Sequence, residues 1–133
     1  MTMNGSWGYN AGDKRWKSVA DCVAYLVTAA SGGGNYLLNI GPKADGSVPA
    51  ESVKILKAIG KWMGRNGEAI YNSDRAEMDQ MFDVLGRWTV KGNLAYLHCF
   101  AWPGTATPTP TTASERRRAP QRLTPGALTT AVW

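Results

Sequence analysis

The chain has 133 residues, of which 44% are hydrophobic, and a formal charge of +5 at neutral pH. This length can bury one hydrophobic core. No apolar run approaches the roughly 18 residues that span a bilayer, and the first residues do not resemble a signal peptide, so we expect a soluble chain of unassigned localisation. Residues 105–133 carry a net charge of +3, without interleaved aromatic residues. The basicity is therefore mostly a property of the tail and argues against a nucleic-acid partner.

The first segment, residues 2–10, is predicted to be a short strand that enters a loop lasting through Asp13. Trp7 lies in this segment with Gly5 and Gly8 near it. A large aromatic residue among glycines is more often a packing plug than a ligand platform. The alternative is that the indole is presented to a sugar, whose C–H faces pack well on an aromatic ring.

The next segment is predicted to be a helix. Ser18 followed three residues later by Asp21 resembles a capping box. Glycine at 32 and 33 provides the left-handed backbone that ends a helix. Apolar residues recur in between at helical spacing, at Val19, Cys22, Val23, Leu26, Ala29 and Ala30.

The apolar run Tyr36–Ile40 lies between a glycine cluster and Gly41-Pro42. It is too short for a helix and shows no alternation, so we expect a strand buried on both faces in a parallel sheet. With the segments before it, the order is strand, helix, strand, a βαβ unit. The residues Asn39–Pro42 stand at the end of the strand where α/β proteins place their chemistry.

An Asp45-Gly46 turn follows the strand, without the spacing of a phosphate loop. Pro49 is predicted to lie in the first turn of a second helix, which Asn66-Gly67 closes. We interpret the basic residues of this helix as a solvated face. Its predicted apolar face consists of Val53, Leu56, Ile59, Gly60 and Met63.

Residues 74–83 show no firm pattern, and a β-hairpin is predicted next, from Arg87 to Trp102 around Gly92-Asn93. His98, the single histidine, is interpreted as a surface or hydrogen-bonded residue. Cys22 and Cys99 are too isolated for a disulfide framework or a metal site and are expected to be buried. Residues 105–133 are rich in Thr, Pro, Ala and Arg, and we expect them to be disordered.

Five motifs, in the same order and at the same spacings, resemble the retaining α-L-fucosidases, a family of glycoside hydrolases. The likeness is close over residues 2–73 and looser through the hairpin. The motifs are Thr2–Asn10, Trp16–Ser18, Gly33–Pro49, Ile59–Met63 and Asn66–Tyr71.

The resemblance implies an α/β fold. Residues 1–73 would be the last two βα units of a (β/α)8 barrel, with residues 2–10 and 34–41 as its seventh and eighth strands. Residues 74–104 would begin a β-sandwich, and residues 105–133 would be the disordered tail. The resemblance also implies that Trp7 lines the fucose pocket near the sugar's methyl group. Asn4 and Asn39 match the family motifs as well and are further candidates for substrate binding, although structural duties are favoured for both.

The same resemblance implies that the catalytic carboxylates are missing. In the family, the nucleophilic aspartate and the acid/base glutamate precede the motif that begins this chain, and neither has a matching position here. No catalytic residue is therefore assigned, and Asp13, Asp45 and Glu68 are only weak substitutes. The start at Met1 and the uncharacteristic tail suggest a truncated gene product, with a frame shift as the hypothesis for the tail.

Two functions remain open, beside the possibility of a bare structural remnant with no function. The first is a fucosidase-type hydrolase that acts on a fucosylated glycan or fucoside without a metal or cofactor. The alternative is a non-catalytic fragment that binds sugar through Trp7 or associates with itself through unpaired strand edges.

Overall fold

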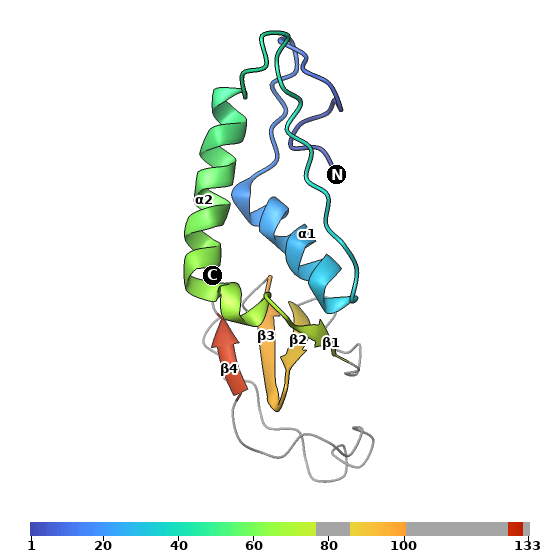
Figure 1. The fold of residues 1–133 in the computed structure, drawn as a ribbon, viewed down its shortest axis with the longest axis vertical. Coiled ribbons are helices and arrows are strands. Elements are labelled where there is room, and N and C mark those ends of the chain that lie inside the picture. The colour runs from blue at the N-terminus through green and yellow to red at the C-terminus, as the bar shows by residue number, and fades with distance from the viewer. Residues whose placement is uncertain (77–85, 101–127, 132–133) are drawn as a thin grey trace.

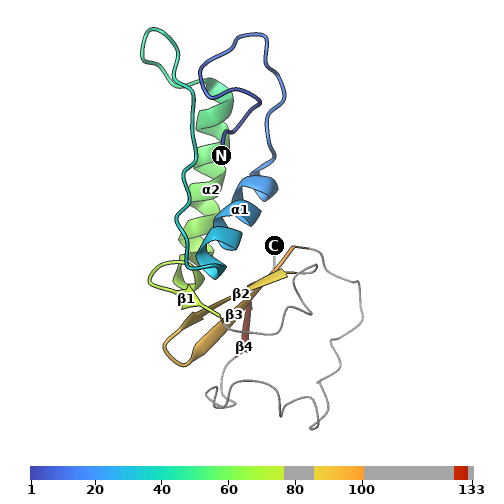
Figure 2. The same ribbon diagram turned by 90° about the vertical axis from the view of Figure 1, so that its right-hand side faces the viewer.

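The computed structural model describes residues 1–76, 86–100 and 128–131. Two helices, α1 (Val19–Ser31) and α2 (Ala50–Asn66), lie side by side, and loops gather at one end of the pair while a sheet lies at the other (Figures 1 and 2). The 3-10 turn η1 (Gly67–Ala69) follows α2. The sheet contains β1 (Asp74–Arg75), β2 (Gly86–Lys91), β3 (Leu94–Cys99) and β4 (Leu128–Ala131). Neither helix in the described ranges is long and apolar enough to cross a membrane.

Helix α1 has the predicted capping box. The Asp21 main-chain N–H donates to Ser18 Oγ at 3.0 Å, and the Ser18 N–H donates to Asp21 Oδ2 at 3.1 Å. Two N–H groups that the helix leaves without partners are thereby satisfied. Gly33, at φ +68°, follows the last turn, so the sequence predicted both ends of α1.

Helix α2 ends at Asn66–Gly67 as predicted, but Pro49 is its N-cap residue rather than part of its first turn. The apolar face agrees with the prediction at Ile59, which packs against the core, but differs from it one turn earlier. Ile55 is buried, whereas Leu56, which was expected on that face, is 39% exposed. The four basic residues of the helix are exposed, in agreement with a solvated face, and they are Lys54, Lys57, Lys61 and Arg65.

The core between the helices and the N-terminal segment is small. Met3 and Cys22 are fully buried, and Ile55 is nearly so. Partly buried apolar residues surround these three, namely Met1, Trp16, Val19, Leu38, Ile40 and Ile59. This core fixes the N-terminal segment against both helices, and the loops at the end of the helix pair extend from it.

The segments Met1–Met3 and 37–40 are parallel, as the βαβ prediction requires, but they form one bridge, Thr2 to Asn39, rather than two full strands. The Asn39 N–H donates to the Met1 carbonyl at 2.9 Å, and the Met3 N–H donates to the Asn39 carbonyl at 3.3 Å. The expected burial of both faces is wrong, because Leu37 is 72% exposed. Among the described residues, segment 37–40 has a single strand neighbour, and a buried parallel strand needs neighbours on both sides.

The predicted hairpin is confirmed by β2 and β3, with Gly92 in the left-handed region at its turn. Its predicted end at Trp102 lies outside the described residues. β1 pairs antiparallel with β2, and β4 pairs parallel with β3, with Ala95 opposite Leu128. Strand β4 departs from the tail predicted to be disordered over 105–133, because the outer edge of β3 offers backbone groups with which four residues can pair. The remainder of that prediction concerns residues 105–127 and 132–133, which lie outside the described residues.

Candidate functional site

Trp7 lies in the loop that leaves the carboxyl end of the Met1–Met3 segment, next to the loop that follows Ile40. Its side chain is 64% exposed. The interpretation of Trp7 as a packing plug is therefore wrong for this chain. The reason is that Trp7 lies in the loop beyond the parallel pair and is not among the residues that form or cover the core around Met3. The indole is available at the strand ends, where α/β proteins bind ligands.

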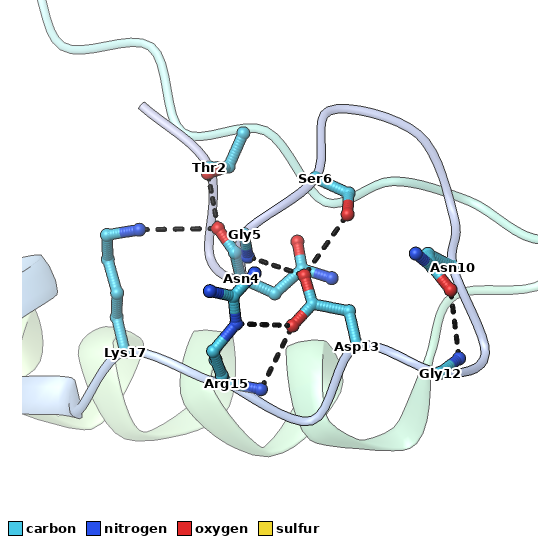
Figure 3. Close-up of polar contacts among 9 residues, drawn as sticks. All are labelled: Thr2, Asn4, Gly5, Ser6, Asn10, Gly12, Asp13, Arg15 and Lys17. Carbon is cyan, nitrogen blue, oxygen red and sulfur yellow. Dashed lines mark hydrogen bonds and ion pairs between the residues drawn. The ribbon is translucent and has the colours of Figure 1, made fainter.

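Asp13 organises the loop before Trp7 (Figure 3). Its Oδ2 accepts hydrogen bonds from the Gly5 N–H at 2.8 Å and from Ser6 Oγ at 3.1 Å. Its Oδ1 accepts from the Arg15 N–H at 3.1 Å and faces Arg15 Nε at 3.5 Å. The Arg15 N–H, assisted by the Ser6 hydroxyl and the Gly5 N–H, lowers the pKa of the Asp13 carboxyl below its ordinary value. Asp13 is thus an ionised anchor, a role that the sequence analysis missed.

Asn39 holds the same loop at Trp7. Its Nδ2 donates to the main-chain carbonyl of Trp7 at 2.5 Å. Gly41 lies against this contact at φ +54°, and a Cβ at that position would stand 3.3 Å from the Trp7 carbonyl oxygen. Only glycine combines the left-handed backbone with so close an approach.

Asn4 is 8% exposed, and its main-chain carbonyl accepts from Thr2 Oγ1 and from Lys17 Nζ, the latter at 3.3 Å (Figure 3). The fold therefore brings all three predicted site residues, Asn4, Trp7 and Asn39, to one loop cluster. In the described contacts, the Asn39 side chain supports the loop that carries Trp7, whereas Asn4 takes part through its main-chain carbonyl.

The loop after Ile40 contacts the loop that carries Trp7 through Lys43 and Tyr9. Lys43 Nζ lies 5.9 Å from the centroid of the Tyr9 ring, which is within the range of a cation–π contact. Asp45 closes the turn by accepting from the Ser47 N–H at 2.9 Å, and the Ser47 hydroxyl and N–H lower the pKa of this carboxyl. The sequence alone does not indicate a contact between Tyr9 and Lys43, because that contact joins two loops distant in sequence.

The three carboxylates considered as substitutes do not form a catalytic pair. Asp45 precedes α2 and Glu68 follows it, and a helix of 17 residues is about 26 Å long, whereas the carboxyl groups of a retaining glycosidase are about 5 Å apart. Both oxygens of Asp13 are occupied by the loop. Glu68 accepts from Tyr96 Oη at 3.1 Å, at the sheet end of the molecule.

His98 lies far from this loop cluster, in the hairpin, and is 1% exposed. The Thr89 hydroxyl donates to the Ala69 carbonyl at 2.6 Å and lies 2.9 Å from His98 Nε2. Because the hydroxyl hydrogen is already used, Nε2 carries the imidazole proton. The prediction of a hydrogen-bonded histidine is confirmed. Burial lowers its pKa to about 4, and the ring contacts the Thr89 hydroxyl that bonds the hairpin to the Ala69 carbonyl of η1.

No group of three His, Cys, Asp or Glu side chains suited to a metal ion occurs in the described part of the chain. Cys22 and Cys99 are both buried free thiols, as predicted. Burial raises the pKa of each thiol, so neither is an activated nucleophile.

Comparison with known proteins finds relatives of this chain in one family. Residues 1–68 match the alpha-L-fucosidase family profile. Human tissue alpha-L-fucosidase is 39% identical over 102 residues, which are 74% of this chain and 22% of that protein. Human plasma alpha-L-fucosidase is 37% identical over 103 residues. The chain thus spans about a fifth of the length of the curated relatives it matches.

Solved structures agree with these relatives. Alpha-L-fucosidase isoenzyme 1 from Paenibacillus thiaminolyticus is 41% identical with a TM-score of 0.66, over 70% of this chain and 22% of that one. The Thermotoga maritima alpha-fucosidase in complex with fucose is 32% identical with a TM-score of 0.61, over 68% of this chain and 23% of that one. Sequence and structure together show that the chain belongs to the alpha-L-fucosidase family.

Proposed function

We propose that this chain is the fucose-binding closing part of an α-L-fucosidase-type glycoside hydrolase, in which Trp7 forms a wall of the sugar site. The observation that carries this proposal is the 64% exposure of the Trp7 indole at the carboxyl end of the parallel pair. An exposed indole is a large apolar surface with one polar N–H, and a fucosyl ring can cover it with its C–H groups and its methyl group. The Asn39 amide bonds the loop that presents the indole, and the buried Asn4 lies at the start of that loop.

We also propose that the two parallel segments are neighbouring strands of a (β/α)8 barrel. The order of parallel segment, α1, parallel segment and α2 is the repeating unit of a (β/α)8 barrel. Met1–Met3 and segment 37–40 would be the seventh and eighth strands, and Trp7 would then project into the site at the carboxyl ends of the strands. The hairpin of β2 and β3 would begin the β-sandwich that follows.

We further propose that the chain binds fucosides without cleaving them. A retaining glycosidase needs a nucleophile and an acid/base within about 5 Å of each other. Asp45 and Glu68 stand at opposite ends of α2, and the loop occupies both oxygens of Asp13. The two catalytic carboxylates would therefore have to come from polypeptide other than the residues described here.

Binding of L-fucose, measured by isothermal titration calorimetry, tests the proposal. The 133-residue chain should bind the sugar, and Trp7→Ala should remove the binding. Tyr25→Ala is the matched control, because Tyr25 is a 51% exposed aromatic residue on α1, away from the loops. Equal fucose affinity for Trp7→Ala and the native chain would refute the assignment of Trp7.

Self-association is the second function that an observation favours. Leu37 is 72% exposed in a segment that has one strand neighbour among the described residues. We propose that a second copy of this chain pairs with that open edge and covers Leu37. Light scattering should then give a mass above 14.4 kDa, and Leu37→Lys should return it to the monomer value. A native chain that scatters as a monomer would exclude this pairing.

A further inference from the structure

We propose that Asp13 and Asn39 are positioning residues that together set the orientation of Trp7. The consequence for sugar binding rests on the proposed function, whereas the positioning itself is a statement about the loop alone. Neither side chain needs to touch the sugar. Each acts through the main chain of the loop that carries the indole.

Asp13 fixes the two residues that directly precede Trp7. Its Oδ2 accepts from the Gly5 N–H and from the Ser6 hydroxyl at once, at 2.8 and 3.1 Å. The side chain is 3% exposed, so water competes little for these hydrogen bonds, and bonds to a charged acceptor are stronger than neutral ones. Gly5 is required for this approach, because a Cβ there would stand 2.7 Å from Oδ2.

Asn39 fixes Trp7 itself. Its side-chain amide donates to the Trp7 carbonyl at 2.5 Å. The main chain of Asn39 is held on both sides, since its N–H donates to the Met1 carbonyl and its carbonyl accepts from the Met3 N–H. Met3 is fully buried in the core. The amide therefore connects the main chain of Trp7 to a segment that is hydrogen-bonded to the buried Met3.

With the main chain held before Trp7 and at its carbonyl, the indole retains little freedom beyond its own two side-chain torsions. A binding wall that is ordered in advance loses less entropy when the ligand arrives. Removing either anchor should therefore weaken fucose binding even though the indole is still present, and the weakening should accompany a measurable change at Trp7.

Fluorine NMR of the full chain labelled with 5-fluorotryptophan tests the positioning directly. The chain has six tryptophans, and the signal missing from Trp7→Phe identifies Trp7. Asp13→Asn keeps the shape of the side chain but replaces an acceptor with a donor. Asn39→Asp places a carboxylate against the Trp7 carbonyl. Asp45→Asn is the matched control, since Asp45 also accepts a loop N–H but has no described contact with residues 5–8.

Asp13→Asn and Asn39→Asp should shift or broaden the Trp7 signal while the Trp88 signal of β2 stays in place, and Asp45→Asn should leave the Trp7 signal unchanged. Fucose affinity should fall by about tenfold in the first two variants, the equivalent of one net hydrogen bond. An unchanged Trp7 signal in both variants, with Trp88 in place, would overturn the proposal.

If Asp13→Asn loses the Trp88 signal and thus the fold, Ser6→Ala takes its place, because it removes one of the hydrogen bonds to Asp13. A Trp7 signal that moves in Ser6→Ala supports the proposal, and one that does not move overturns it. Failure of the proposed function is distinguishable from failure of the positioning. In the first case the native chain does not bind fucose, yet the Trp7 signal still responds to the anchor variants.

Discussion

Acid should destabilise the hairpin and its junction with η1, because the Thr89 hydroxyl, which bonds the Ala69 carbonyl of η1, also bonds a neutral His98. The ring is 1% exposed, its Nε2–H is directed at Thr89 Oγ1, and its Nδ1 has no hydrogen-bond partner. Protonation would create a buried N–H at Nδ1 with no acceptor. Burial alone accounts for the lowered pKa, and the residue opposite His98 on β2 is Arg87, whose charge cannot favour protonation.

The size of the effect follows from the pKa of about 4 in the folded chain and the ordinary value of 6.5 in the unfolded chain. Each pKa unit corresponds to about 1.4 kcal/mol, so the gap amounts to about 3 kcal/mol. The folded state has the lowered pKa, so this stability is fully present above pH 6.5 and is lost as the pH falls towards 4. Below the folded pKa, this residue causes no further loss.

Urea denaturation between pH 7 and pH 4 measures the effect, with tryptophan fluorescence as the signal. His98→Phe is the comparison, because phenylalanine fills the site without titrating and Thr89 can still donate to Ala69. The free energy of unfolding of the native chain should fall by about 3 kcal/mol more than that of His98→Phe. Carboxylates that titrate in this range contribute equally to both proteins and cancel. Parallel pH profiles for the two proteins would refute the account of His98.

Three further predictions concern stability and are measured by the same denaturation at neutral pH. Gly41→Ala should destabilise the chain by more than Gly46→Ala: both replace a glycine at positive φ, at about 1 kcal/mol of strain, but an added Cβ meets the Trp7 carbonyl only at Gly41. Equal losses would show that the contact with the Trp7 carbonyl does not matter. Ser18→Ala removes the N-cap of α1 and should cost about 1 kcal/mol, and a smaller cost for Ser18→Gly would fit a lost cap. Gly86→Ala should prevent the hairpin from pairing, because the new Cβ would collide with the His98 carbonyl, and native-like stability of that variant would contradict the register of β2 and β3.

The features that the sequence predicted correctly are local. The capping box needs Ser18 and Asp21 three positions apart, and the hairpin needs a Gly92-Asn93 turn between two strand patterns. Physical chemistry within about one turn of chain decides such features, and a single sequence displays it. The two buried cysteines belong with them, because each falls on an apolar position of a regular pattern.

The predictions that failed concern burial and strand pairing, which depend on the tertiary neighbours of a segment and not on its own sequence. The pattern of Tyr36–Ile40 shows that both faces are apolar, but burial of Leu37 requires a neighbour that the described residues do not supply. Trp7 was interpreted as a plug for the same reason, since composition cannot tell whether a loop side chain packs against the core. Strand β4 formed where the tail met the edge of β3.

The roles of Asp13 and Asn39 in holding the Trp7 loop could not be recognised from the sequence either. Asp13 is recognised as an anchor only when the loop closes and places Gly5 and Ser6 at its carboxylate. The amide of Asn39 reaches the Trp7 carbonyl across 32 positions of sequence. The resemblance of the motifs named Trp7, Asn4 and Asn39 as candidates for substrate binding, but it could not show which contacts hold these residues in place.

Release of nitrophenol from 4-nitrophenyl α-L-fucoside tests most directly the claim that this chain presents a sugar-binding wall without a catalytic pair. The account predicts that the native chain, at concentrations where it binds fucose, releases nitrophenol no faster than buffer does. Turnover above the buffer rate that disappears when Asp13, Asp45 and Glu68 are together replaced by alanine would contradict it.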